Sequence, residues 1–523
     1  MTTALSRIGA IVGADFRIRF RRVSTVIVFL LLSAFAYLWI PSPSTGRALI
    51  QINGRRAINN SGAIGLGTAS IGMIFVGLFG YYVISNAIRR DVVSRCGLIA
   101  ASTPMRTGEY LLGKFVGNLT FLATFLCGFM VSSMVMLAVR GEARLDPFVF
   151  IEQYLLLTPA AIVFVSAVAV LFESIRWLSG KFGDVVYFFL WCAVFGLVVG
   201  NETSHGRINW ARYFDFTGFG FMINQMQQTL QTHEVAIGSS RFDPTKPPIL
   251  FPGLTLTREW LVPRLVSVLA PLALLPVAGL FFHRFDPVRT RRIAGKGSRN
   301  WIGRIQNLFK PLSRRAAALL TIPGRGTSFL SAMWADAVLT FTLYPLVFVA
   351  LLALTILTLI VPMATIMPVV FAVLAVIVSD IATRDVRAGT TASVRSIARL
   401  RESYVWWKLG STSLLSLLFC AAAIARTVPR GWFAIFALII GIVFVATTAT
   451  ALGVTTANPK TFIVGFLTFW YVIINDHGMN PMLDFAGFYG RATIPATALY
   501  AGISIVAIAL AETFYRMRLA RGR

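Results

Sequence analysis

The sequence predicts an all-α polytopic membrane protein with about 12 transmembrane helices, organised as two repeats of about six helices each. Three observations lead to this prediction: the composition, a series of long apolar runs, and motifs that occur twice in the same order. Hydrophobic residues make up 56% of the 523 residues and charged residues only 13%, which is unlike an ordinary soluble domain. We therefore expect lipid to be the main solvent of this chain.

The apolar runs predict where the spans lie. A helix needs about 20 mostly apolar residues to cross a bilayer. The first part of the chain has runs at residues 23–40, 62–88, 115–139, 155–172, 185–200 and 261–282. After a polar interval, further runs lie at residues 343–361, 366–378, 409–424, 432–456, 462–474 and 492–511. A signal peptide is the alternative for the first run, but that run continues past the Ala-Phe-Ala sequence at 34–36, so we expect a span.

The distribution of basic residues predicts the orientation. Lysine and arginine outnumber aspartate and glutamate by 48 to 21. The basic segments, at residues 17–22, 89–106, 284–325 and 516–523, each follow an even number of predicted spans. By the positive-inside rule both termini are then cytoplasmic, in what we expect to be the plasma (inner) membrane of a prokaryote. Attraction to anionic membrane lipids explains most of the excess charge, and no nucleic acid partner is predicted.

Motifs shared by the two halves indicate an internal repeat. Each half has an aspartate before its first span, an Arg-Asp pair with a Ser, a Tyr and a Lys between its second and third spans, and Asp-Phe-x-Gly-Phe between its fifth and sixth. The first set is Asp15, Arg90, Asp91, Ser102, Tyr110, Lys114 and residues 215–219, and the second is Asp336, Arg384, Asp385, Ser396, Tyr404, Lys408 and residues 484–488.

The repeat divides the chain into three predicted parts. Residues 1–283 are the first six-helix repeat, 284–330 a basic cytoplasmic linker, and 331–523 the second six-helix repeat. Within the linker, residues 301–320 have the pattern of an amphipathic interfacial helix. Parallel repeats of equal span number are related by a pseudo-twofold axis along the membrane normal.

Two insertions distinguish the first half. Residues 41–61 are long where the second half has a tight turn at 362–365, and residues 222–259 have no counterpart; both are predicted to lie on the outer side. Residues 242–248 contain too much proline for regular structure. A lid, a partner-docking element and a plain solvated loop all remain open for the second insertion.

The loop between the second and third predicted spans points to a family. From Arg89 to Lys114 it reads Arg-Arg-Asp-Val-Val-Ser-Arg-Cys-Gly-Leu-Ile-Ala-Ala-Ser-Thr-Pro-Met-Arg-Thr-Gly-Glu-Tyr-Leu-Leu-Gly-Lys. It resembles the corresponding cytoplasmic loop of type-2 ABC transporter permeases, in which an Arg-Asp pair, a Ser-Thr-Pro turn and a Tyr-Leu-Leu-Gly-Lys segment recur. The resemblance covers nearly the whole chain twice, as if two permease units were fused.

The resemblance implies a coupling helix in each loop that docks on a cytoplasmic ABC ATPase subunit, present in two copies. ATP and magnesium would then be bound by that partner, with no cofactor and no catalytic site in this chain. The implied coupling residues are Arg90, Asp91, Gly97, Ser102, Thr103, Pro104, Glu109, Tyr110 and Lys114, and then Arg384, Asp385, Gly389, Ser396, Tyr404 and Lys408. The second loop departs from the pattern because Ser-Ile-Ala at 396–398 replaces Ser-Thr-Pro, so the two docking sites are expected to be unequal.

The residues of the first loop favour a helix. Positions 91–101 have room for about three helical turns, with Asp91 near the positive end of the helix dipole and Pro104 ending the helix. The same loop matches the first part of a phosphate-binding loop, but Phe115 stands where a magnesium-binding Ser or Thr is required. We therefore predict no nucleotide site here.

The function that the sequence favours is export of an amphipathic or hydrophobic cargo. An ion-coupled transporter and a non-transporting scaffold or sensor are the alternatives, and the first is disfavoured because no predicted span has an ionisable residue near its middle. The chain has no His-Glu-x-x-His or Gly-x-Ser-x-Gly motif and no CxxC pair, so neither an enzyme nor a metal site is indicated.

Two further sets of residues are candidates for the transport path. An outer gate is the functional interpretation of Asp215, Phe216, Gly218, Asp484, Phe485 and Gly487, and helix capping by the aspartates is the structural one. Aromatic residues of the apolar runs are candidates to line the path, although packing is favoured for each of them: Phe75, Phe79, Tyr81, Phe371 and Trp470. Additional membrane or outer-side subunits are also possible partners.

Overall fold

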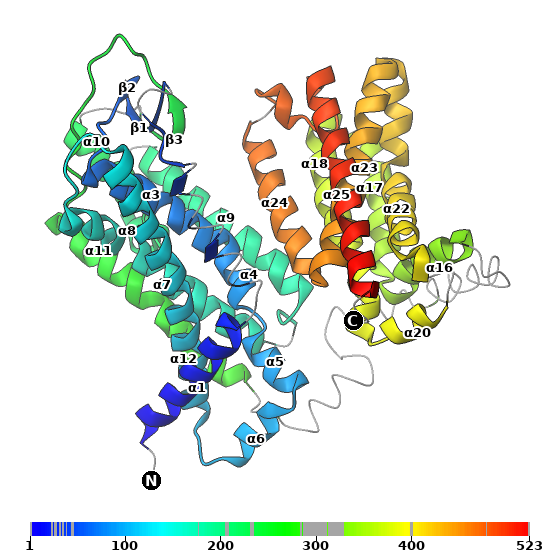
Figure 1. Cartoon of the computed structure of the whole chain (residues 1–523), viewed down its shortest axis with the longest axis horizontal. Helices are drawn as coiled ribbons and strands as arrows, with labels where there is room; N and C mark the ends of the chain where they lie inside the picture. The colour runs from blue at the N-terminus through cyan, green and yellow to red at the C-terminus, as the bar shows by residue number, and fades with distance from the viewer. Residues whose placement is uncertain are drawn as a thin grey trace. The chain divides into compact units, whose positions relative to one another are not determined.

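The computed structural model describes residues 3–21, 46–175, 177–203, 209–230, 235–282, 329–397, 401–476 and 478–520, with single residues or short stretches at 25–42, 285 and 311 (Figure 1). The chain divides into two compact units, Met1–Gly295 and Lys296–Arg523. Most of the predicted first span at 23–40 and nearly all of the amphipathic segment at 301–320 lie outside the described residues.

The first unit consists of helices and one small sheet. Its helices are α1 (Ala4–Phe20), α3 (Ser61–Phe75), η2 (Val76–Gly80), α4 (Tyr81–Ile84), α5 (Ala87–Val93), α6 (Cys96–Ser102), α7 (Thr107–Arg140), α8 (Pro147–Ser174), α9 (Lys181–Thr203), η3 (Asn209–Phe214), α10 (Phe219–Leu230), α11 (Arg258–Leu269), η4 (Ala270–Ala273) and α12 (Leu274–Phe281). Its strands are β1 (Arg47–Ile52), β2 (Arg55–Arg56) and β3 (Val235–Arg241).

The described part of the second unit consists of helices. They are α16 (Phe329–Leu343), α17 (Leu346–Ile360), α18 (Met363–Val378), η6 (Ile381–Thr383), α19 (Arg384–Ala388), α20 (Thr391–Ser396), α22 (Tyr404–Thr427), η7 (Val428–Arg430), α23 (Trp432–Thr456), α24 (Pro459–Asp476), η8 (Pro481–Leu483) and α25 (Ile494–Ala520).

Long apolar helices confirm a helical, polytopic membrane protein. Among the described residues, nine helices are long and apolar enough to cross a membrane, and each covers one predicted run: Ser61–Val92, Thr107–Arg140, Pro147–Ser174, Lys181–Asn201, Arg258–Phe281, Met363–Ala388, Tyr404–Arg430, Trp432–Thr456 and Ile494–Ala520. Helices α16 and α17 pass the same test only as a pair bent by 97°, which makes ten. The predicted run at 462–474 is helix α24, but the polar residues at its ends, Lys460, Asn475 and Asp476, lower its mean hydropathy.

Local signals in the sequence begin two of the long helices. Asn60 caps α3 by accepting a hydrogen bond from the backbone N–H of Ala63 at 2.8 Å. Asp146 caps α8 in the same way, and Pro147 stands at the first helical position, where its missing N–H costs nothing. Each cap lies at the same end of its helix as the small sheet (Figure 1).

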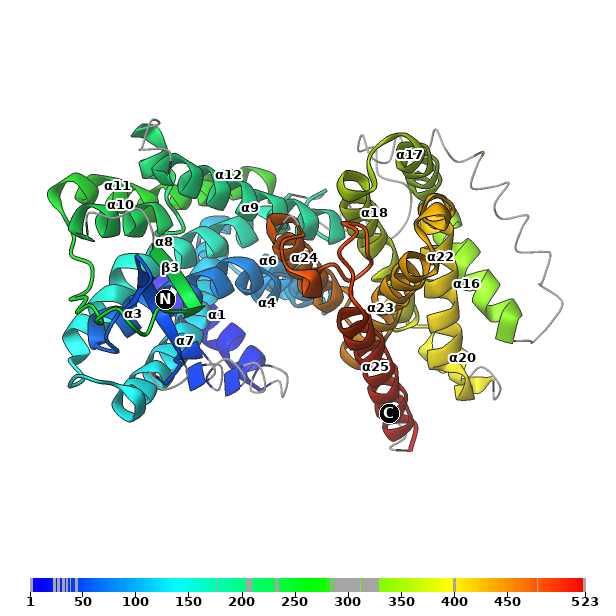
Figure 2. The same ribbon diagram turned by 90° about the horizontal axis from the view of Figure 1, so that it is seen from above.

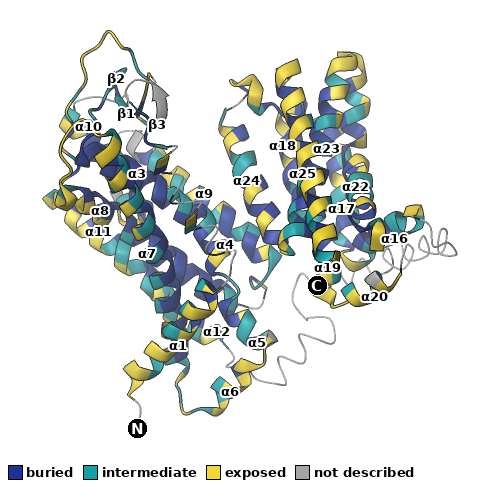
Figure 3. Cartoon of the chain, in the orientation of Figure 1, coloured by how far each residue is buried: buried dark blue, intermediate teal, exposed yellow. Residues whose placement is uncertain are grey.

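Helices α3 and α8 form the centre of the first unit. In an apolar 18-residue window, 83% of the residues are buried in the span Ser61–Val92 that α3 begins and 72% in α8, against 33% in α7 (Figure 3). Small residues allow this close packing. A Cβ added at Gly77 would come within 1.9 Å of the Trp191 ring, so only glycine fits at that position of η2. Viewed from above, α8 lies between α7 and the pair α11 and α12 (Figure 2).

The two insertions of the first half contribute strands to one sheet. Strand β1, from the insertion at 41–61, pairs antiparallel with β2 and with β3, which comes from the insertion at 222–259. Residues 242–248 contain no helix or strand, as predicted, and residues 246–257 return toward α11. A plain solvated loop is therefore the wrong interpretation of the second insertion.

The returning residues are anchored to the helices of the same unit. The backbone N–H of Leu254 donates to Gln153 Oε1 at 2.8 Å, and Gln153 Nε2 donates to the Leu254 carbonyl at 3.1 Å. Asn60 donates to the Phe251 carbonyl at 2.8 Å, and a Cβ at Gly62 would come within 2.4 Å of the backbone of residue 252. Such paired bonds and backbone contact fix the segment against α3 and α8.

A bidentate ion pair links the sheet to the loop between α7 and α8. The Arg56 guanidinium lies 2.5 and 2.8 Å from the two carboxylate oxygens of Glu142. Glu142 also accepts the backbone N–H of Asn59 at 3.1 Å. The hydrogen bond from Arg56 lowers the pKa of Glu142 below its ordinary value of 4.5, against the opposing effect of burial.

This ion pair predicts a pH dependence of stability. Because the folded-state pKa of Glu142 is lowered, its contribution is complete above pH 4.5 and is lost as the pH falls through the lowered value. We expect Glu142→Gln to cost about 1 kcal/mol at pH 7, seen as a fall of about 2 °C in the apparent melting temperature of the detergent-purified protein. Glu152→Gln, at an exposed position of α8, is the control. An equal effect of Glu142→Gln at pH 7 and at pH 3 would contradict this.

Candidate functional site

The repeated charged residues of the first unit meet in one buried cluster. The Lys114 ammonium lies 3.1 Å from both carboxylate oxygens of Asp15 and 2.7 Å from Asp91 Oδ2. The Arg90 guanidinium lies 2.6 Å from Asp15 Oδ1, and Tyr110 donates its hydroxyl to Asp91 Oδ2 at 2.8 Å. These bonds connect α1, α5 and α7. We call this group the first charge cluster.

The corresponding residues of the second unit form the same arrangement. Lys408 Nζ lies 2.9 Å from Asp336 Oδ2 and 2.6 Å from Asp385 Oδ2. Arg384 lies 2.9 Å from Asp336 Oδ1, and Tyr404 donates to Asp385 Oδ2 at 3.2 Å. This second charge cluster connects α16, α19 and α22, so the motifs that repeat in the sequence also make the same contacts.

Each charge cluster is neutral, which makes its burial possible. Two carboxylates face one lysine and one arginine, and the lysines are 2% and 0% exposed. Isolated charges at such positions would cost several kcal/mol, and mutual pairing offsets much of that cost. In the second cluster the Lys408 ammonium also lies 4.0 Å from the centre of the Trp407 ring.

Comparisons with family models, with curated proteins and with solved structures find no match. The site is therefore argued from its own geometry.

The first loop contains two short helices in place of the single helix predicted over 91–101. Helix α5 ends at Val93, and Arg95 adopts a left-handed conformation with φ of 60° before α6 begins at Cys96. Glu173 of α8 accepts the backbone N–H groups of residues 87, 88 and 89 and so caps α5. The prediction that Asp91 stabilises the helix start is wrong for this unit, because Asp91 lies in the last turn and pairs with Lys114.

The remaining residues of the first loop fix where α6 ends and α7 begins. The hydroxyls of Ser102 and Thr103 donate hydrogen bonds to the backbone carbonyls of residues 99 and 100, at 2.8 and 2.7 Å. Pro104 follows outside any helix. Glu109 accepts the backbone N–H of Arg106 at 3.1 Å and pairs with Arg7 of α1 at 2.8 Å. The Ser-Thr-Pro sequence thus ends the helix, as predicted.

The helices of the second loop are shorter than those of the first, and α20 is more polar than α6. Gly389 ends α19 in the left-handed conformation, with φ of 72°. Helix α20 follows, with the sequence Thr-Ala-Ser-Val-Arg-Ser, and the Ser396 hydroxyl donates to the Ser393 carbonyl at 2.7 Å. The sequence departs from Ser-Thr-Pro at Ile397 and at residue 398, and the second of these lies outside the described residues.

Exposed apolar side chains distinguish the first loop. Leu98 and Ile99 are adjacent on α6 and are 44% and 68% exposed. In the described part of the second loop the large exposed apolar side chains are Val386 and Ile397, which lie on either side of α20. Within the described residues of the two loops, it is the first that presents neighbouring exposed apolar side chains on one short helix.

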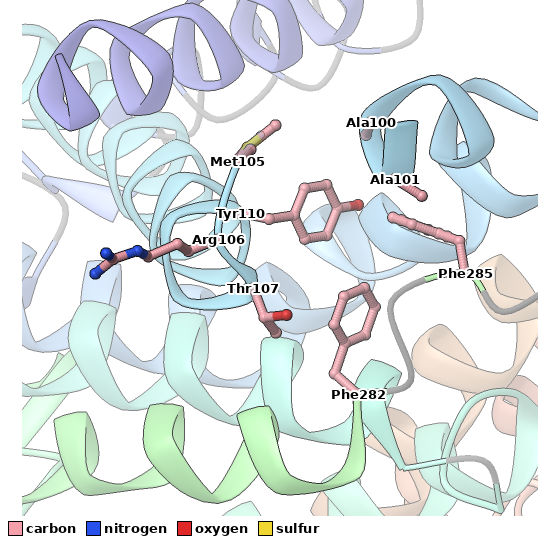
Figure 4. A pocket seen from close by; sticks show the side chains of 8 residues that line it. All are labelled: Ala100, Ala101, Met105, Arg106, Thr107, Tyr110, Phe282 and Phe285. Atoms are coloured by element: carbon pink, nitrogen blue, oxygen red, sulfur yellow. The ribbon is translucent and has the colours of Figure 1, made fainter. Parts of the chain in front are cut away.

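A shallow pocket lies beneath each loop, between the loop and aromatic rings. In the first unit Tyr110 is stacked on Phe282 with ring centres 5.4 Å apart, and Phe285 meets it edge-on at 5.3 Å (Figure 4). In the second unit Tyr404 is stacked on Tyr515 of α25 at 4.9 Å. The tyrosine of each cluster therefore contacts an aromatic ring in or just after the last helix of its unit.

The two Asp-Phe-x-Gly-Phe turns pack against the middle of long apolar helices: Phe216 is stacked on Phe164 of α8 with ring centres 4.6 Å apart, and Phe485 meets Phe371 of α18 at 4.9 Å. Asp215 accepts the backbone N–H of Phe221 at 2.9 Å and so caps α10, while Gly218 takes a left-handed conformation. The buried Arg264 donates to the Asp215 carbonyl at 2.9 Å and to the Leu156 carbonyl at 2.6 Å. This geometry agrees with the capping interpretation of the first turn.

The second turn lacks a buried arginine contact of this kind among the described residues. Asp484 accepts the backbone N–H groups of Tyr489 and Arg491 at 3.3 and 2.9 Å, and Gly487 has φ of 67°. Burial raises the pKa of Asp484, while these backbone donors oppose the change. Phe485 is buried among the rings of Phe371 and Phe444.

The aromatic candidates for a transport path lie mostly in the packing of their own units. Tyr81 is stacked on Tyr187 at 3.9 Å, Phe371 is fully buried, and the Trp470 indole donates to the Pro368 carbonyl at 2.6 Å. Phe75 and Phe79 are stacked on each other at 5.6 Å. Packing therefore accounts for these residues. The described residues also contain no group of His, Cys, Asp and Glu suited to a metal ion.

The charge clusters predict that removing one buried charge lowers stability strongly, and that removing an opposite charge as well restores part of it. Lys408→Met leaves two buried carboxylates facing one arginine, so we expect a loss of about 3–5 kcal/mol of stability. Adding Asp385→Asn restores neutrality and is expected to recover part of that loss. Thermal unfolding of the purified variants measures both effects.

An exposed ion pair provides the control for this experiment. Arg516 pairs with Glu512 at 2.7 Å, but the arginine side chain is 74% exposed, so Arg516→Met is expected to change little. Equal destabilisation by Arg516→Met and Lys408→Met, or no recovery in the double variant, would contradict the role given to the cluster.

Proposed function

We propose that this chain is the membrane permease subunit of an ABC exporter, with two type-2 permease units fused in one polypeptide. Two copies of a separate cytoplasmic ABC ATPase bind and hydrolyse ATP with magnesium, and this chain has no catalytic site of its own. The cargo is amphipathic or hydrophobic and leaves the cytoplasm or the inner leaflet. The direction and the ATPase partner rest on the resemblance of the first loop to that family.

The observation that supports this proposal best is the pair of charge clusters. The first holds its Arg-Asp loop against α1 and α7, and the second holds its loop against α16 and α22; a loop that moves a helix bundle needs such an attachment. Docking also requires an exposed surface, and α6 presents Leu98 and Ile99 next to each other. Apolar side chains on a rigid element are the usual anchors of a protein interface.

The clusters suggest how force passes from the ATPase to the membrane helices. A push on α6 reaches α5 across the short break at residues 94–95, and Asp91 at the end of α5 is bonded to Lys114 of α7. Lys114 is in turn bonded to Asp15 of α1. Packed side chains and charged hydrogen bonds of this kind are the physical means by which coupling travels through a protein.

The topology that belongs to this proposal has 12 spans in two repeats related by a pseudo-twofold axis, as the sequence predicts. Both termini and both loops face the cytoplasm of a prokaryotic cell, and the sheet of the first unit faces outward. The Asp215 and Asp484 turns pack against the middle of the spans, where we propose that they close the path toward the outer side. Further outer-side subunits would meet the protein at the sheet.

ATP hydrolysis in the presence of the chain tests the proposal. The chain is co-expressed with an ABC ATPase encoded beside it, and the complex is reconstituted in lipid vesicles. We expect the chain to change the ATPase rate by several-fold, and Ile99→Glu to abolish copurification, because a charge on α6 cannot be desolvated at the interface. Leu145→Glu, an exposed apolar position between α7 and α8, is the matched control.

The same vesicles separate this proposal from the main alternative. Export of a hydrophobic dye is followed with ATP, and then without ATP under a proton or sodium gradient. Transport that needs only the gradient would overturn the proposal and support an ion-coupled transporter. Copurification that is indifferent to both Ile99→Glu and Leu145→Glu would exclude α6 as the docking element.

A further inference from the structure

Phe285 belongs to the predicted linker between the repeats, yet it packs within the first unit. Its side chain is 6% exposed and contacts the rings of Tyr110 and Phe282 (Figure 4). Its backbone is left-handed, with φ of 58°, a conformation that is unfavourable for a large aromatic residue. A conformation of this kind persists only where the surrounding contacts hold it in place.

The ring of Phe285 fills the space beside one residue of α6. A Cβ added at Gly97 would come within 2.4 Å of the Phe285 ring, so the ring is in direct contact with the helix backbone. Gly97 is itself buried, although both of its neighbours, Cys96 and Leu98, are exposed. One face of α6 therefore lies against the linker residue while the opposite face presents the exposed apolar side chains.

The contacts of Phe285 continue to the first charge cluster. Tyr110, which Phe285 meets edge-on, donates its hydroxyl to Asp91. The linker residue is thus one ring away from the buried ion pairs that hold the loop.

The second unit has no equivalent arrangement among its described residues. There the tyrosine of the cluster stacks on Tyr515, a residue within helix α25 whose hydroxyl donates to the Arg401 carbonyl at 2.9 Å. The support of the second loop thus comes from a residue within a long helix, and the support of the first comes from Phe285, which follows α12.

We propose that Phe285 is a positioning residue for α6, so that its ring holds the first docking helix in its working orientation. Displacement of this ring then displaces α6. The positioning itself is independent of what α6 binds, while its consequence for an ATPase rests on the proposed function.

Hydrogen exchange of the purified full-length chain, followed by mass spectrometry on peptides covering residues 96–103, tests the positioning. We expect Phe285→Ala to speed exchange in α6 by about ten-fold, because local opening depends on the buried contacts that hold a segment. Phe285→Tyr keeps the ring and is expected to restore most of the protection. A peptide covering α20 is the internal control for the fold of the other unit.

A double substitution distinguishes positioning of α6 by the Phe285 ring from a general loss of stability. With the ring present, Gly97→Ala is expected to speed exchange in α6, because its Cβ overlaps the ring. In the Phe285→Ala background the same change should slow exchange by a few-fold, because alanine favours a helix more than glycine does. Gly108→Ala, where a Cβ meets nothing within 4 Å, is the matched control.

Two results would overturn the inference: exchange in α6 unchanged by Phe285→Ala, or the same effect of Gly97→Ala in both backgrounds. Neither readout involves an ATPase. A failure of the proposed function, seen as no ATPase stimulation by the unaltered chain, is therefore distinguishable from a failure of this inference.

Discussion

A buried lysine shared between two aspartates is the interaction on which each half of this protein depends. Lys114 joins Asp15 and Asp91, and Lys408 joins Asp336 and Asp385. The members of each pair come from different helices, so the cluster fixes the position of the loop relative to the membrane helices. An arginine completes neutrality in each case, which permits burial without an uncompensated charge.

The two halves use this shared attachment differently. The first loop has a capped α5, an apolar surface on α6 and a linker residue packed behind α6. The second loop is more polar and is supported by α25. Among the described residues, the sheet built from two insertions and the Arg264 contact to the Asp215 turn occur in the first half. Because of these contacts, we interpret the first half as the one in which the loop and the Asp-Phe-x-Gly-Phe turn are held more firmly.

Much of the helical architecture and part of the site followed from the sequence, because span length and repeated motifs are local signals. The Arg90-Asp91 pair, Tyr110 and Lys114 were predicted as a set with their counterparts, and Asp15 was recognised as repeated but not as a partner of Lys114. That contact joins residues about a hundred positions apart, and nothing in the sequence indicates it. Similarly, β1 and β3 are short and lie in separate insertions, so their pairing depends on tertiary packing. The cap from Glu173 also depends on a contact between helices, α5 and α8.

The most direct test of the account is electron cryomicroscopy of the chain purified together with an ABC ATPase encoded beside it. The account predicts two ATPase subunits on one face of the membrane, one in contact with α6 and the other with α20, and both charge clusters intact beneath them. An ATPase bound at any other surface, or loops that are free of contact in the assembled complex, would contradict it.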